Sequence, residues 1–205
     1  MRKNDTQAEN QKQALQDPRI ERLCDPHVRP LTELIVRWQE TTGLNFPWVD
    51  PDDGGVNAKV LFLQHTPGRM AVRSGFVSRS NPDRTAKNAG AALDHAGFAR
   101  CEYVRWNVVP YYISTADKDG KATKRQVCEA ATYTQEFIDR LPNLRVVVFC
   151  GRKAQIAIPH LKLPAGVEAL ETFHCGGQSF DARPKQKAHI LETYRTAYRL
   201  MAEDR

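Results

Sequence analysis

The chain has 205 residues, which suits one domain of ordinary size with enough apolar side chains for a sizeable core. A formal net charge of +6 favours an anionic partner, nucleic acid first, and five cysteines without paired spacing indicate reduced thiols in the cytoplasm. We expect no membrane span, no closed zinc or iron–sulfur site and no secretory signal, because long apolar runs, C-x-x-C pairs and an apolar leader are missing.

The N-terminal part divides into two segments of different character. Residues 1–25 are polar and charged without apolar periodicity, so we predict a flexible or loosely docked extension there and a single domain over residues 26–205. A helix that ends near Gly43 is predicted from four apolar residues at helical spacing, namely Leu31, Leu34, Ile35 and Trp38.

Apolar runs in the rest of the chain predict buried strands, separated by helices and polar loops. The predicted strands are Val60–Gln64, Tyr103–Val109, Val146–Cys150 and Val167–Phe173. Four helices are predicted between and after these strands. The first begins at a cap on Asn81 or Asp83, and the second runs through residues 130–141. The third is short and follows Gly151, and the fourth spans Pro184–Met201. Turn residues mark 68–82 and 114–123 as loops.

This alternation of strands and helices predicts an α/β fold, a three-layer α/β/α sandwich around a central, mainly parallel four-stranded sheet. Ligands of such sheets bind just beyond the carboxyl ends of the strands. The first of the four predicted strands ends in Gln64, His65 and Thr66, before the turn at Pro67 and Gly68. We therefore expect the functional site at this turn, with segments 74–80, 104–111 and 172–180 beside it.

Five segments, taken in chain order, resemble the motifs of one enzyme family. The turn Gln64-His65-Thr66-Pro67-Gly68 resembles its G-x-x-P-G motif, Gly75-Phe76-Val77 its P-F-V-G segment, and Trp106-Asn107-Val108-Val109-Pro110 its T-N-x-V-P strand end. Val146–Arg152 resembles its V-V-L-L-G-R strand and turn, and His174, followed by Cys175-Gly176-Gly177-Gln178-Ser179, its H-P-S motif. From about Lys59 to Tyr198 the chain is thus similar to the uracil-DNA glycosylase superfamily.

The resemblance implies how an everted uracil would be bound. Asn107 would read the N3–H and O4 groups of uracil, Gln64 would lie beside the base, and Phe76 would stack on its face. His174 would act as a neutral ring that donates a hydrogen bond to uracil O2, where negative charge builds as the glycosidic bond breaks.

Water activation is the point at which this chain departs from the family pattern. Thr66 stands in the place of the water-activating Asp, and a hydroxyl is no base at neutral pH, so Thr66 would only position water. His65 is the alternative base, since its unperturbed pKa lies near neutral pH. A third alternative needs no base, because an oxocarbenium ion is reactive enough for a positioned water.

Basic and polar side chains near the expected site favour contacts with DNA phosphates and the minor groove. The candidates are Arg69, Arg73, Arg79, Gln178, Ser179 and Lys185. A solvated basic surface is the alternative interpretation of the arginines.

The sequence therefore predicts a monofunctional, monomeric DNA glycosylase that flips uracil out of DNA, hydrolyses its N-glycosidic bond and leaves free uracil and an abasic site. We expect no metal, no cofactor and no membrane partner. Three alternatives stay open. They are a protein that binds uracil-containing or damaged DNA without hydrolysis, a glycosylase for hypoxanthine or xanthine, and a small-molecule nucleoside hydrolase that uses His65 and His174.

Overall fold

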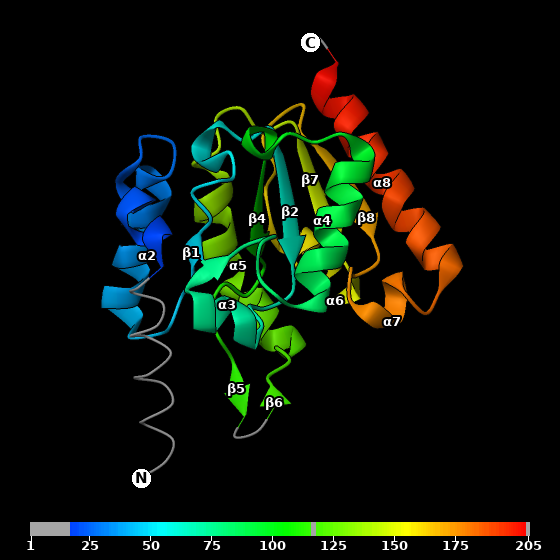
Figure 1. Ribbon diagram of the computed structural model, residues 1–205. Coiled ribbons are helices and arrows are strands. Elements are labelled where there is room, and N and C mark those ends of the chain that lie inside the picture. Colours follow the sequence, from blue (N-terminus) through cyan, green and yellow to red (C-terminus); the bar gives the residue numbers. More distant parts are fainter. Residues whose placement is uncertain (1–16, 116–117, 204–205) are drawn as a thin grey trace.

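A parallel sheet of four strands forms the centre of the computed structural model, which describes residues 17–115 and 118–203 (Figure 1). Its strands lie in the order β4–β2–β7–β8, and all neighbouring pairs are parallel. Their bounds are β2 Val60–Gln64, β4 Tyr103–Asn107, β7 Val146–Cys150 and β8 Glu168–Thr172. The predicted α/β fold with a parallel four-stranded sheet is confirmed, and the carboxyl ends of all four strands meet at one edge.

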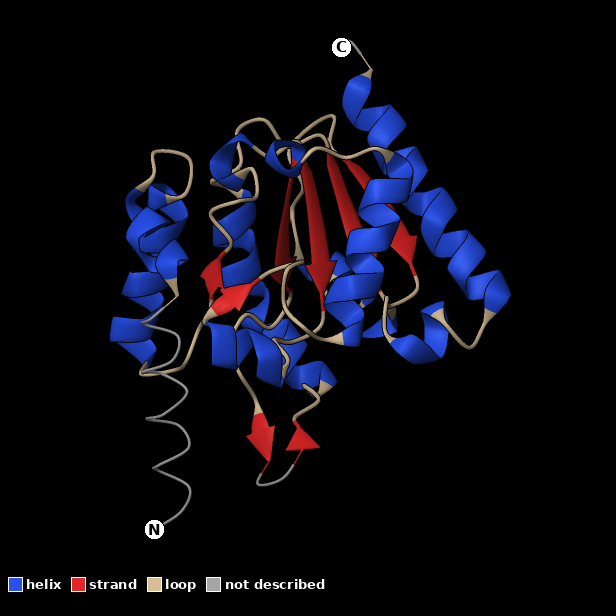
Figure 2. Ribbon diagram, in the orientation of Figure 1, coloured by secondary structure: helices blue, strands red, loops and turns tan. Residues whose placement is uncertain are grey.

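Long helices cover both faces of this sheet (Figure 2). One face packs against α4 (Arg84–Ala96) and α8 (Pro184–Ala202), and the other against α2 (Arg29–Thr42) and α5 (Lys124–Ile138). Short helices α3 (Arg69–Ser74), α6 (Arg152–Gln155) and α7 (Gly177–Phe180) lie near the carboxyl edge (Figure 1). The 3-10 helices are η1 Pro18–Cys24, η2 Gly55–Asn57, η3 Arg100–Glu102 and η4 Ile158–His160.

Side chains of the central strands alternate between the two cores. Leu61 and Leu63 pack in the core that contains Trp106, on the side of α2 and α5. Phe62 packs in the other core, under α4 and α8, where its ring contacts those of Phe98 and Tyr194. Because the side-chain period of a strand is two residues, Gln64 follows Phe62 on the α4 and α8 face.

Two predicted loops contain short elements that a sequence pattern does not reveal. Segment 68–82 contains α3 and β3 (Phe76–Val77), which pairs in parallel with β1 (Trp48–Val49). Segment 114–123 contains the antiparallel pair β5 (Ser114–Thr115) and β6 (Lys118–Asp119). A strand of two residues is too short to show periodicity, which explains why both pairs were missed.

The polar extension predicted over residues 1–25 is docked to the domain in its described part, residues 17–25, and its remainder lies outside the described residues. The η1 helix begins at the N-cap Asp17, whose carboxylate accepts the Arg19 backbone N–H. Arg19 then forms an ion pair of 3.1 Å with the buried Asp50. Ion pairs between polar segments dock this helix, and apolar periodicity gives no sign of them.

Within residues 17–115 and 118–203, no helix combines the length and the apolar character that crossing a bilayer requires. Those same ranges hold no group of three or more His, Cys, Asp or Glu side chains that could bind a metal ion. All five cysteines are free.

We predict that Phe62→Ala lowers the free energy of unfolding by about 3–5 kcal/mol, because the ring is 1% exposed and its removal leaves a cavity. Urea unfolding followed by circular dichroism measures this loss. The control is Leu44→Ala, at a residue that is 40% exposed, and it should change stability by less than about 0.5 kcal/mol. A loss below 1 kcal/mol for Phe62→Ala, as a rough threshold, would contradict the packing described.

Candidate active site

Two amide side chains lie next to each other at the carboxyl edge of the sheet. Gln64 ends β2 and Asn107 ends β4, and the two are direct partners in the parallel register. Pairing continues past both strands, because the N–H groups of Val108 and Val109 donate to the carbonyls of Gln64 and His65. Gln64 is 8% and Asn107 2% exposed, so both amides lie inside the protein.

Each of these amides has a buried polar atom without a hydrogen-bond partner. The atoms are Gln64 Nε2, a donor, and Asn107 Oδ1, an acceptor. A buried polar group that lacks a partner is destabilising by about 1–3 kcal/mol, so each such atom calls for an explanation, and a ligand that completes it is one. A planar ligand with an N–H next to a carbonyl oxygen would satisfy both atoms at once.

His174 follows β8 at the same edge and packs against the turn after β7. That turn is Gly151, whose φ of +95° suits glycine, and a Cβ atom there would lie only 2.9 Å from the His174 Cβ. The Gly176 N–H donates to His174 Nδ1 over 2.9 Å, so the neutral ring carries its proton on Nε2. Burial, and then the charge of Arg105, lower the pKa of His174. The site thus holds a neutral imidazole that donates through Nε2.

His65, directly after β2, has the opposite hydrogen-bonding character. Burial, and next the charge of Lys153, lower the pKa of His65 to about 4. The His65 ring also forms a hydrogen bond with the Ala122 backbone, and this bond favours the tautomer whose proton lies on the bonded ring nitrogen. The Nε2 atom is buried without a partner, and in this tautomer it presents a lone pair. The partly buried Thr66 follows in the chain, so both candidates for positioning water lie on one turn.

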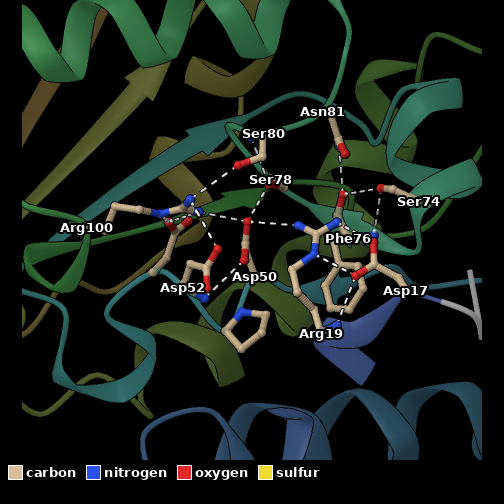
Figure 3. Close-up of polar contacts among 12 residues, drawn as sticks. Asp17, Arg19, Asp50, Asp52, Ser74, Phe76, Ser78, Ser80, Asn81 and Arg100 are labelled. Carbon is tan, nitrogen blue, oxygen red and sulfur yellow. Dashed lines mark hydrogen bonds and ion pairs between the residues drawn. The ribbon is translucent and has the colours of Figure 1, made fainter. Parts of the chain in front are cut away.

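Phe76 lies beside a different polar cluster, on β3. Its side chain is fully buried, and the Arg19 guanidinium lies 4.2 Å from the ring centroid (Figure 3). Arg19 is held there by Asp17 and Asp50. Stacking of a base on Phe76 stays a prediction, and in the conformation described here Arg19 covers one face of the ring.

The predicted DNA-contacting residues fall into two groups. Arg79 is tied to the fold, because it binds both carboxylate oxygens of Asp94 at 2.7 and 2.6 Å, and we leave it out of the proposed interface. The others lie on the short helices of the carboxyl edge or at the start of α8, with Ser179 partly buried and the rest exposed: Arg69, Arg73, Gln178, Ser179 and Lys185.

One site residue, Arg105, was missed by the sequence analysis. It lies in the middle of β4, two residues before Asn107 and on the same face, and is 3% exposed. Its Nη1 atom is buried without a partner. The available signal was a charged residue inside the apolar strand Tyr103–Asn107, at the alternation that matches Asn107.

Comparison with known proteins assigns the family. The model of the uracil DNA glycosylase superfamily matches residues 51–205. The chain belongs to this superfamily. The family predicted from the five motifs is therefore confirmed.

Among solved structures, the chain is similar to a point variant of mimivirus UNG in complex with UGI, with 14% sequence identity and a TM-score of 0.39. The match covers 78% of this chain and 69% of that chain. No curated protein matches the sequence.

We predict that His65 makes this glycosylase-superfamily protein sensitive to acid. The folded pKa near 4 lies below the ordinary value of 6.5, so between these pH values the unfolded chain binds more protons. Stability contributed by neutral His65 is therefore present above about pH 6.5 and is lost as pH falls towards 4. Proton NMR of the ring should show a titration midpoint near 4, and a midpoint near 6.5 would contradict the burial described.

The variant that tests this acid sensitivity is His65→Asn, and its control is His95→Asn, at an exposed residue. Urea unfolding at pH 7 and pH 5 should show a smaller loss on acidification for His65→Asn than for the wild type. His95→Asn should keep the wild-type loss. Burial raises the pKa of Asp53 to about 7, so Asp53 increases the free energy of unfolding on acidification. This contribution is the same in all three proteins and cancels when they are compared.

Proposed function

We propose that this protein is a DNA glycosylase that removes uracil from DNA by hydrolysis of the N-glycosidic bond. The observation that carries the proposal is the pair of unsatisfied atoms at adjacent strand ends, Asn107 Oδ1 and Gln64 Nε2. Uracil offers an N3–H donor flanked by two carbonyl acceptors, which is the complement of this pair. Cytosine presents a lone pair at N3 and an amino group at C4, and would leave the same atoms unpaired.

The leaving base requires stabilisation of negative charge. When the bond between C1′ and N1 breaks, its electron pair stays with the base, and charge builds on O2 while the sugar becomes an oxocarbenium ion. The Nε2–H of His174 is the preorganised donor for O2, and its neutrality is supported by burial and by the Gly176 contact. Such donors typically lower a barrier by roughly 3–4 kcal/mol.

The water that attacks C1′ needs an acceptor more than a strong base. His65 Nε2 offers a lone pair, while a pKa near 4 makes it a weak base at neutral pH. We propose that His65, with Thr66 on the same turn, positions the water. Its proton leaves to bulk solvent after oxygen bonds to the oxocarbenium carbon. We also propose that the enzyme acts as a monomer in the cytoplasm.

A second candidate function is binding of uracil-containing DNA without hydrolysis. Two observations favour it, namely Thr66 in the place of the family's Asp and the weak basicity of His65. The same recognition atoms serve both functions, so the assay of the bond itself separates them.

We predict that the protein, incubated with a uracil-containing oligonucleotide and then treated with hot alkali, produces strand scission at the uracil. Single-stranded and double-stranded substrates, and matched oligonucleotides with cytosine, thymine or hypoxanthine, are run together. Tight binding without scission would overturn the glycosylase proposal in favour of the second candidate. Scission at hypoxanthine alone would overturn the assignment of uracil.

Two substitutions test the assigned atoms in the same assay. Asn107→Asp should slow uracil excision at least about 100-fold, since a carboxylate repels uracil O4. His174→Ala should slow it about 100- to 1,000-fold by removing the donor to O2. The controls are Asn143→Asp and His160→Ala, at exposed positions that are not part of the proposed base site. Wild-type rates for either site variant would remove its assigned role.

A further inference from the structure

Arg105 is a buried charge for which the fold offers little compensation. It is 3% exposed and forms no ion pair with a carboxylate of the described residues, and the nearest compensation is the long-range attraction between its charge and the buried Asp53. Its Nη1 atom is buried without a hydrogen-bond partner. Burying a guanidinium in this way is destabilising, so stability does not explain the presence of an arginine at this position.

The register of the sheet places Arg105 under the base site. It is the Cα partner of Phe62, as Asn107 is the partner of Gln64, and all four side chains lie on the α4 and α8 face. Arg105 is thus one alternation deeper than the two amides that would hold the base. His174 closes the same region from β8, near enough for the Arg105 charge to act on its ring.

We propose that Arg105 is an electrostatic residue of the base site, whose buried positive charge stabilises the negative charge that develops on the departing base. This inference rests on the proposed function. A fixed charge in a region that excludes water acts strongly and needs no reorganisation as the bond breaks. The Arg105 charge also disfavours protonation of His174, so that ring stays neutral and donates through Nε2.

Several charged groups face His174 and set its protonation together. Arg105 lowers the pKa of His174, and Asp83, the N-cap of α4, raises it. His65 and His174 act on each other, because burial and then the charges of Lys153, His174 and Lys121 disfavour protonation of His65. Removing the Arg105 charge therefore leaves Asp83 to favour imidazolium at His174.

The first experiment needs no hydrolysis. Binding of free uracil and of 5-nitrouracil, an anion at neutral pH, is measured by calorimetry for wild type, Arg105→Met and Arg105→Lys. The wild type should prefer the anion about 10-fold or more, Arg105→Lys should retain this preference, and Arg105→Met should lose it. Equal binding of anion and neutral base by the wild type, or an unchanged preference in Arg105→Met, would overturn the proposal.

The second experiment separates an electrostatic role from a structural one. By NMR, the His174 midpoint should rise in Arg105→Met by about half a pH unit or more, stay near wild type in Arg105→Lys, and fall in Asp83→Asn. Thermal unfolding of Arg105→Met should occur at or above the wild-type temperature, because an unpaired buried charge has been removed. An unfolding temperature well below wild type, with an unmoved His174 midpoint, would make Arg105 a structural residue and overturn the proposal.

The third experiment connects Arg105 to the chemistry. Single-turnover excision of uracil should be about 100-fold slower in Arg105→Met, and excision of 5-fluorouracil should slow less, because its anion needs less stabilisation. The control is Arg125→Met, at a side chain that is 87% exposed. Equal slowing of both substrates would overturn the proposal. A wild type that excises neither base would instead refute the proposed function, and the calorimetry and NMR would still decide the role of Arg105.

Discussion

The site depends on the parallel pairing of β2 with β4. This register sets Gln64 beside Asn107, and backbone bonds from Val108 and Val109 continue it past both strand ends. A slip of one residue would turn Asn107 to the opposite face, because the side-chain period of a strand is two. The two apolar cores that flank the strands prevent such a slip, since it would exchange their apolar side chains with polar ones. The position of the two amides, and with it the proposed recognition of a base edge, is therefore a consequence of how the core packs.

Burial favours the neutral form of both histidines, and their hydrogen bonds give the two rings opposite donor and acceptor character. His174 accepts at Nδ1 from the Gly176 N–H and so donates at Nε2, whereas His65 is bound through the Ala122 backbone and leaves a lone pair at Nε2. A donor is what a developing anion requires, and an acceptor is what an attacking water requires. One environment of low polarity would thus support both steps of the proposed reaction without a carboxylate at Thr66.

The sequence was sufficient for the strands and long helices, because β-branched runs such as Val146–Cys150 and the spacing in α2 reflect burial directly. It also located Gln64, Asn107 and His174 at strand ends, which parallel topology brings to one edge. It missed what depends on tertiary contacts between distant polar residues. The ion pair of Arg19 with Asp50 docks η1 and covers Phe76, and neither partner belongs to a periodic pattern. The role of Arg105 follows only from its register and burial.

Two buried polar clusters in this molecule differ in how far their polar groups are satisfied, although Oδ2 of Asp53, beside Asp50, is also without a partner. Around Asp50, the carboxylate is bound by Arg19, Arg100 and the Ser78 hydroxyl (Figure 3), and these bonds join η1, the segment after β3 and η3. Such saturation stabilises one arrangement of the chain. At the carboxyl edge, Asn107 and its neighbours keep open donors and acceptors that are destabilising in the free protein. A bound molecule that completes these bonds would remove this cost, so we propose the cluster around Asn107, rather than the more highly charged one around Asp50, as the place of the reaction.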